Sequence, residues 1–113
     1  MHELAITEGI MDTALPAAKA AGAQKILEIR LKIGDLSGVF PEYITENFEK
    51  LSKGTIAEGA KLKFSKIPAS IHCMQCGFEG EINRSKIECP KCSGTDFKIT
   101  SGREYYVDSL EVE

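Results

Sequence analysis

The chain has 113 residues and a formal net charge of −3, so it has room for one ordinary domain with a small appendage. The acidic balance argues against a general nucleic-acid binder. No apolar run reaches the length of a transmembrane helix, and the first residues lack the basic cluster of a signal peptide. We therefore expect a cytoplasmic protein that has neither a nucleic-acid nor a membrane partner.

Residues 4–21 predict the first helix, because apolar side chains recur at helical spacing. Pro16 removes a backbone donor within this pattern and predicts a kink near residues 12–16. Gly22 suits the end of the helix. The side chains expected on the inward face are Leu4, Ile10, Met11, Ala14, Leu15, Ala18 and Ala21.

Residues 25–33 predict a strand by strict alternation, with Leu27, Ile29, Leu31 and Ile33 facing a core and charged residues facing water. Pro41 suits the first turn of a second helix that runs to about Lys53. The residues expected to face inward from this helix are Ile44, Phe48 and Leu51.

Two further strands are predicted over residues 60–67 and 104–112, the latter with Tyr106 and Leu110 as candidates for burial. All four cysteines lie between these strands. The predicted fold is α+β: a small three-stranded sheet with two helices on one face, plus an inserted four-cysteine zinc-ribbon lobe. The predicted domains are residues 1–68 with 103–113, which form a discontinuous α/β domain, and residues 69–102, which form the zinc-binding domain.

The cysteines form two Cys-x-x-Cys pairs, Cys73 with Cys76 and Cys89 with Cys92, separated by twelve residues. Two such turns facing each other supply four thiolates at the corners of a tetrahedron, which Zn(II) accepts. Gly77 and Gly94 follow the two turns, where a positive φ is expected. A closed shell of four thiolates leaves no open coordination position, so the zinc is expected to be structural.

Three other functions of the two cysteine pairs compete with a structural zinc site. A thioredoxin-like redox motif needs one pair at the start of a helix, and neither pair has that context. Iron in a rubredoxin-like site also uses paired turns, although only Phe78 and Phe97 supply aromatic rings nearby. A zinc ribbon that binds nucleic acid is the main competitor, but the basic residues between Cys73 and Cys92 are balanced by an equal number of acids.

The N-terminal tripeptide Met1-His2-Glu3 can act as a chelator. The Met1 amine and the His2 amide close a five-membered ring on a metal, and the His2 amide and imidazole close a six-membered one. Three nitrogens in a plane suit Ni(II) or Cu(II), and Glu3 can supply a fourth donor. Ordinary start residues are the alternative reading.

The chain resembles the HypA family of nickel metallochaperones. The resemblance rests on Met1-His2-Glu3, on the stretch from Ile33 to Glu42, on both cysteine pairs and on Ser109-Leu110-Glu111, and it spans the whole chain. It implies a non-enzymatic protein that delivers Ni(II) to the hydrogenase large subunit with a HypB-type GTPase; some relatives also serve urease maturation. It implies nickel binding by His2 with Met1 and Glu3, and Zn(II) binding by the four cysteines.

The second histidine, His72, precedes Cys73 directly. We expect it to be a solvated residue beside the zinc site, and a role as a metal ligand is the minor alternative. No Walker-type phosphate loop or catalytic constellation is present in the sequence. The sequence therefore predicts a metal carrier, with a nucleic-acid adaptor and an electron carrier as the competing classes.

Overall fold

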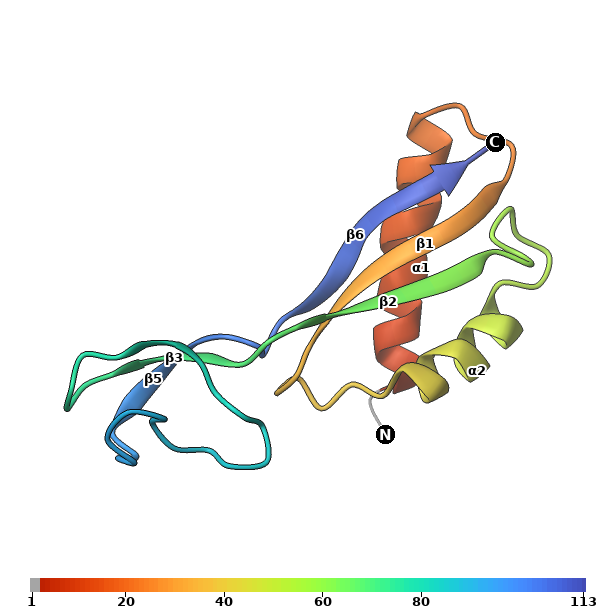
Figure 1. Ribbon diagram of the computed structural model, residues 1–113. Coiled ribbons are helices and arrows are strands. Elements are labelled where there is room, and N and C mark those ends of the chain that lie inside the picture. Colours follow the sequence, from red (N-terminus) through yellow and green to blue (C-terminus); the bar gives the residue numbers. More distant parts are fainter. Residues whose placement is uncertain (1–2) are drawn as a thin grey trace. The chain divides into compact units, whose positions relative to one another are not determined.

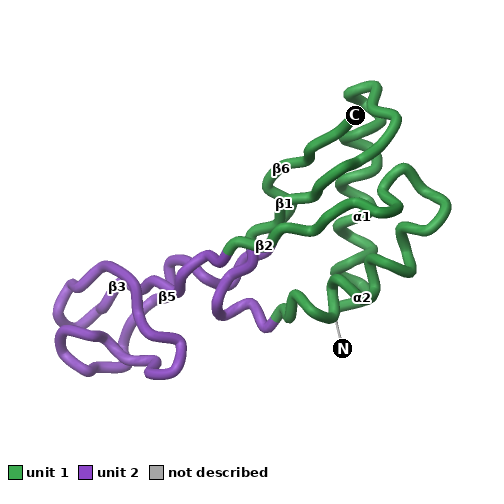
Figure 2. The backbone as a smooth tube through the Cα atoms, turned by 45° about the vertical axis from the view of Figure 1, so that its right-hand side comes forward, with its two compact units in different colours: residues 1–32, 39–65, 106–113 green, residues 33–38, 66–105 purple. Residues whose placement is uncertain are grey.

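The computed structural model describes residues 3–113 and consists of two compact units (Figures 1 and 2). The first, called the α/β unit here, comprises the chain up to Lys32 together with Val39–Ser65 and Tyr106–Glu113. The second, called the cysteine unit, comprises Ile33–Gly38 and Lys66–Tyr105. No helix among the described residues is long and apolar enough to cross a membrane.

Helix α1 (Glu3–Ala20) presents a stripe of large apolar, small and polar residues to the core. The helix is continuous through Pro16, which lies on its exposed side. The prediction that Leu4 and Ala21 face inward is wrong, because Leu4 is 51% exposed and Ala21 is also exposed. Thr7 is fully buried instead, and its hydroxyl donates to the carbonyl oxygen of Glu3 at 2.5 Å. The buried residues are Glu3, Thr7, Ile10, Met11, Ala14 and Ala18.

The sheet of the α/β unit has the strand order β2-β1-β6, with β1 at Ile26–Gly34, β2 at Lys61–Ile67 and β6 at Tyr105–Val112. Backbone bonds join Ile26 to Ile56 and Asp35 to Ile67, so β2 runs parallel to β1. Bonds join Lys25 to Glu113 and Gly34 to Glu104, so β6 runs antiparallel to β1.

The alternation of buried and exposed side chains along β1 is interrupted near the start of the strand. Ile26 and Ile29 are both fully buried, whereas Leu27 is 37% exposed, so the predicted inward position of Leu27 is wrong. A strict alternation cannot bury residues three apart, and a local irregularity in the strand accounts for the change. In β6, Leu110 is half-buried as predicted, but Tyr106 is 47% exposed and Val107 is half-buried in its place.

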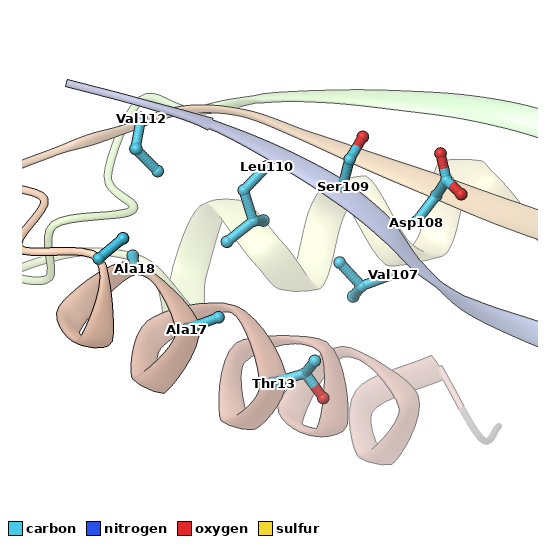
Figure 3. Close-up of a pocket in the computed structure, with 9 residues that line it drawn as sticks. Thr13, Ala17, Ala18, Val107, Asp108, Ser109, Leu110 and Val112 are labelled. Carbon is cyan, nitrogen blue, oxygen red and sulfur yellow. The ribbon is translucent and has the colours of Figure 1, made fainter.

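Helix α2 (Pro41–Leu51) connects β1 to β2 and begins at the predicted proline. It contacts α1, and both helices lie on the same side of the sheet, as Figure 3 shows. Ile44 and Phe48 are its buried residues, and they join the β1 side chains Ile26, Ile29 and Leu31 in the core.

The cysteine unit contains a second three-stranded sheet, in the order β4-β3-β5. Its strands are β3 (Ser70–Cys73), β4 (Glu79–Glu81) and β5 (Phe97–Ser101), and β3 pairs antiparallel with both neighbours. Figure 1 labels β3 and β5 in this unit. The segment Ile33–Gly38 belongs to this unit because Asp35 and Leu36 donate to the carbonyl oxygens of Ile67 and Gly102.

Candidate metal centre

The four cysteine Sγ atoms form one cluster in which all lie within 4.8 Å of one another. The Sγ atoms of Cys73 and Cys92 are 3.7 Å apart, and those of Cys76 and Cys89 are 3.6 Å apart. A tetrahedron with metal–sulfur bonds of ~2.3 Å has edges of ~3.8 Å. The sulfur positions therefore fit one four-coordinate metal ion, and all four cysteines are unbridged thiols.

The two Cys-x-x-Cys turns have the same backbone geometry. In the first, the Gly77 amide donates to the Cys73 carbonyl oxygen at 3.1 Å, and in the second, the Ser93 amide donates to the Cys89 carbonyl oxygen at 2.8 Å. Gly77 has a φ of 77° and Ser93 a φ of 61°. The predicted positive φ at Gly77 is confirmed, but the second positive φ falls on Ser93 and not on Gly94. The positive φ thus falls in both turns on the residue directly after the second cysteine, whether or not that residue is a glycine.

Gly94 serves a different purpose. A Cβ atom at this position would collide with the Oε1 atom of Gln75 and would lie 3.1 Å from the Cys92 Sγ atom. The Gly94 carbonyl oxygen also accepts a hydrogen bond from the Cys89 amide at 2.9 Å. The absence of a side chain therefore lets the second turn close against the first.

Strand β3 and the strand β5 region hold the first turn in place. The Cys73 amide donates to the Phe78 carbonyl oxygen at 2.8 Å, and the Met74 amide donates to the Asp96 carbonyl oxygen at 2.9 Å. Cys73 and Cys89 are fully buried, whereas Cys92 is exposed. The cluster is thus closed on one side by the protein and reachable from solvent on the other.

The pKa values of three of the cysteine thiols depart from the ordinary value of a thiol. The backbone amide of Cys76 donates toward the Cys73 sulfur and, against the opposing effect of desolvation, lowers the pKa of Cys73 to about 6. The Gly94 amide lowers the pKa of Cys92, but desolvation and the neighbouring sulfurs raise the pKa of this thiol to about 12. For Cys76, the Phe78 amide is outweighed by desolvation and by the Cys89 and Cys73 sulfurs, so its pKa is raised. The Cys73 thiolate therefore forms readily, whereas the thiolates of Cys76 and Cys92 require a cation to compensate their charge.

His72 lies outside this cluster of sulfur atoms. Its Nδ1 atom is 2.8 Å from the Oε1 atom of Glu79 on the neighbouring strand, and its side chain is 40% exposed. The metal-ligand group found among residues 3–113 consists of the four cysteines alone. The arrangement agrees with a solvated residue beside the site.

Of the three predicted nickel ligands, Met1 and His2 lie outside the described residues. Glu3 is described; it is 7% exposed and begins α1. It lines a surface cavity of about 320 Å³ together with Leu4, Tyr43, Glu46 and Asn47. The three α2 residues carry no sequence motif, and only their spacing of three and four positions places them on one face of a helix.

Comparison with known proteins identifies the family. Residues 1–112 match the family described as HypA, hydrogenase/urease nickel incorporation, metallochaperone. The hydrogenase maturation factor HypA of Dehalococcoides mccartyi is 39% identical over 113 residues, covering all of this chain and 95% of that protein. The corresponding factor of Methanothermobacter thermautotrophicus is 36% identical over 120 residues, covering all of this chain and 98% of that protein.

A solved structure supports the same fold. The solution structure of the Ni metallochaperone HypA from Helicobacter pylori superposes with a TM-score of 0.70 over 99% of this chain and 97% of that chain, at 24% identity. The whole-chain family match, the relatives and the four-cysteine cluster agree with the resemblance noted in the sequence. The chain belongs to the HypA family of nickel metallochaperones for hydrogenase maturation.

Proposed function

We propose that the protein binds Ni(II) at its N-terminus and delivers it for maturation of the NiFe hydrogenase large subunit, while the four cysteines hold a structural Zn(II). The observation that carries this proposal is the family match over residues 1–112, which spans both metal-binding regions. The protein acts as a carrier and not as an enzyme.

The nickel ligands in this proposal are the Met1 amine, the His2 amide and imidazole, and Glu3. Amine, amide and imidazole nitrogens form fused chelate rings of the kind that favour square-planar Ni(II). The first turn of α1 supports this assignment, because Glu3 lines a surface cavity that the metal's remaining ligands can reach from solvent. Cargo bound near the surface can be passed to an incoming ligand of the acceptor protein.

The apolar surface near this cavity suits a protein partner. Leu4 and Tyr43 line the cavity and are 51% and 52% exposed, and Phe40, also 51% exposed, stacks edge-on against Tyr43 with ring centroids 6.0 Å apart. Exposed aromatic and aliphatic groups beside polar ones are typical of contact surfaces. We assign this surface to the transfer of nickel between the carrier and its partners, a HypB-type GTPase and the hydrogenase large subunit. Urease maturation proteins are a further candidate acceptor.

We assign Zn(II) rather than iron to the four cysteines, because a closed shell of four thiolates matches a structural zinc site. Phe78 and Phe97 are the aromatic residues packed against the cluster of described residues. The proposed division of labour follows the predicted domains: residues 1–68 with 103–113 bind nickel, and residues 69–102 bind zinc. The unbridged cysteines are consistent with the reducing cytoplasm.

Metal titration tests the proposal. The metals held by the untagged protein as purified are first identified by elemental analysis, and the zinc-loaded protein is then titrated with Ni(II). We expect one nickel in addition to one zinc, and loss of the specific nickel with unchanged zinc in the His2→Ala variant. His72→Ala is the matched control, and it should bind both metals normally. One nickel bound at unchanged affinity by His2→Ala would place the nickel site elsewhere, and iron in place of zinc would exclude the structural zinc.

A further inference from the structure

Strand β6 forms an open edge of the sheet in the α/β unit, since it follows β1 in the order β2-β1-β6 and has no further neighbour among the described strands. Glu113 and Lys25 exchange backbone hydrogen bonds at 2.8 and 3.3 Å. In an antiparallel ladder, every second residue counted from Glu113 bonds β1, and the residues between them direct their N–H and C=O groups away from β1. Val112 and Leu110 therefore present donors and acceptors to the open edge.

A groove runs beside this edge, between β6 and α1 (Figure 3). It has a volume of about 380 Å³. On the β6 side, Val107, Leu110 and Val112 point toward α1, as Figure 3 shows. On the α1 side the lining residues are small: Thr13, Ala17, Ala18 and Ala21. These alanines leave room for side chains that come from outside the sheet.

The charge along this edge has one sign. Residues 105–113 contain three acids, Asp108, Glu111 and Glu113, and no Lys or Arg. Arg30 on β1 reaches Glu111 at 3.7 Å but lies closer to Glu28, at 2.6 Å. Asp108 is exposed, lines the groove, and has no ion pair within residues 3–113. The rim of the groove therefore carries net negative charge.

This charge decides what can occupy the edge. A second copy paired through its own β6 would bring acidic strands side by side, and like charges opposite one another destabilise a strand pair. A strand with basic side chains would instead be attracted to the acidic residues of β6. The small residues on α1 favour aliphatic side chains in the groove.

We propose that the β6 edge is a docking site for an extended segment of a partner protein in which aliphatic and basic residues alternate. The segment adds a fourth strand beside β6 and bonds the backbone groups of Leu110 and Val112. Its aliphatic side chains enter the groove over Ala17, and its basic side chains meet Asp108. Backbone bonds supply the affinity, whereas the groove and the charge select the sequence.

Binding of synthetic peptides to the full-length, zinc-loaded protein tests the proposal. The probe is a capped eight-residue peptide that alternates Val and Lys, matched to the eight residues of β6, and fluorescence anisotropy measures its affinity. We expect saturable binding that weakens as salt is added, because screening reduces the charge attraction. The same peptide with Glu in place of Lys should bind at least about tenfold more weakly.

A second peptide separates strand pairing from charge. Methylation of the two central amides blocks both edges of the peptide, because consecutive residues direct their amides to opposite sides, and leaves its charge unchanged. Loss of the backbone bonds should weaken binding at least about tenfold. Equal affinity for the methylated peptide would overturn the proposal, because it would reduce the interaction to charge alone.

Protein variants locate the site. Ala17→Leu fills the groove at an exposed helix position and should weaken binding about tenfold or more. Ala20→Leu adds the same side chain at an exposed α1 position outside the groove and should bind like the parent protein. Asp108→Asn should weaken binding and flatten its salt dependence, whereas Glu49→Gln on α2 should not. Equal effects of the two leucine variants, or self-association of the protein through β6, would overturn the proposal.

Discussion

The two units of this protein hold themselves together by different means. The α/β unit buries a continuous set of aliphatic side chains between its helices and sheet, among them Ile10, Ile26, Ile29, Leu31 and Ile44. The main cluster of the cysteine unit has three fully buried members, Ile71, Cys73 and Cys89, and two of these are proposed metal ligands. A segment of this size cannot sustain a core by apolar burial alone. We infer that the α/β unit is stabilised by its own apolar core, whereas the cysteine unit depends on the metal ion proposed for its four cysteines.

Removal of one ligand is the strongest way to break this comparison. Structural zinc contributes on the order of 10 kcal/mol to the folding of small modules, so Cys76→Ala should abolish zinc binding and disorder the cysteine unit. The α/β unit should keep its structure. Amide hydrogen exchange reports both units separately. Met74→Ala, which alters an exposed residue of the same turn, is the control. Unchanged amide protection in residues 70–102 after loss of zinc would contradict the prediction.

The converse change targets the apolar core. Ile29 is fully buried, and its replacement by Ala should lower the free energy of unfolding of the α/β unit by about 3 kcal/mol. Zinc content should stay at one per chain. Leu27→Ala, two residues away and 37% exposed, should cost less than about 1 kcal/mol. Denaturant unfolding measures both effects, and a loss of zinc in Ile29→Ala at native conditions would show that the two means of stabilisation are not separate.

The pH dependence of zinc affinity sharpens the comparison, because apolar burial does not titrate. Near pH 7 in the metal-free protein, Cys73, with its pKa lowered to about 6, is a thiolate, whereas Cys92, with its pKa raised to about 12, and Cys76, with its pKa also raised, hold protons. Zinc binding must displace at least these two protons, so affinity should fall about 100-fold per unit as pH decreases from 8 to 6. Below the pKa of Cys73 a third proton competes, and the decrease should steepen.

Competition with a chelator of known proton affinity measures this slope. The α/β unit, followed by its own amide exchange, should show no matching transition over the same range. A slope of one proton or less would mean that the thiols are already ionised without the metal.

The smallest effect concerns the two equivalent turns. Ser93 holds a φ of 61°, which costs a residue with a side chain roughly 1 kcal/mol, so Ser93→Gly should stabilise the second turn by about that amount. The reverse change, Gly77→Ser at a φ of 77°, should destabilise the first turn similarly. Zinc affinity of the two variants, compared with the parent protein, gives the sign of each effect. Because the two turns share one geometry, Ser93→Gly should raise the zinc affinity and Gly77→Ser should lower it; changes in the same direction would contradict the prediction.

The sequence predicted the order of the helices and strands of the α/β unit, because each of these elements has a local periodic signal. It did not predict the short strands β3, β4 and β5 individually. The predicted inward position of Leu4 is wrong, because an apolar residue at helical spacing is buried only where another element packs against that part of the helix. The structure buries Thr7 instead, with its hydroxyl bonded to the helix backbone. The burial of a polar residue that satisfies itself within its own turn leaves no hydrophobic signature.

The clustering of the four cysteines was predictable from the sequence, whereas the backbone geometry around them was predicted only in part. The spacing of the cysteine pairs defines which sulfurs can meet, and all four do. The predicted positive φ at Gly94 is wrong, because the turn geometry imposes a positive φ on Ser93, which is not a glycine. Contacts between distant segments, such as the groove between α1 and β6, depend on the register of the assembled sheet, which no local pattern contains.

The position of β6 at the end of the element order matters during synthesis. The ribosome delivers the cysteine segment before β6, so β1 at first lacks the neighbour that completes its sheet. Backbone bonds from Asp35 to Ile67 and from Gly34 to Glu104 hold both ends of the inserted segment beside the end of β1. If the segment closes on the proposed Zn(II) first, it spans this gap as one compact piece rather than as a flexible loop, which lowers the entropic cost of bringing β6 into place. We therefore expect nascent chains made during zinc starvation to expose an unfinished sheet to proteases, even though none of the proposed zinc ligands belongs to that sheet.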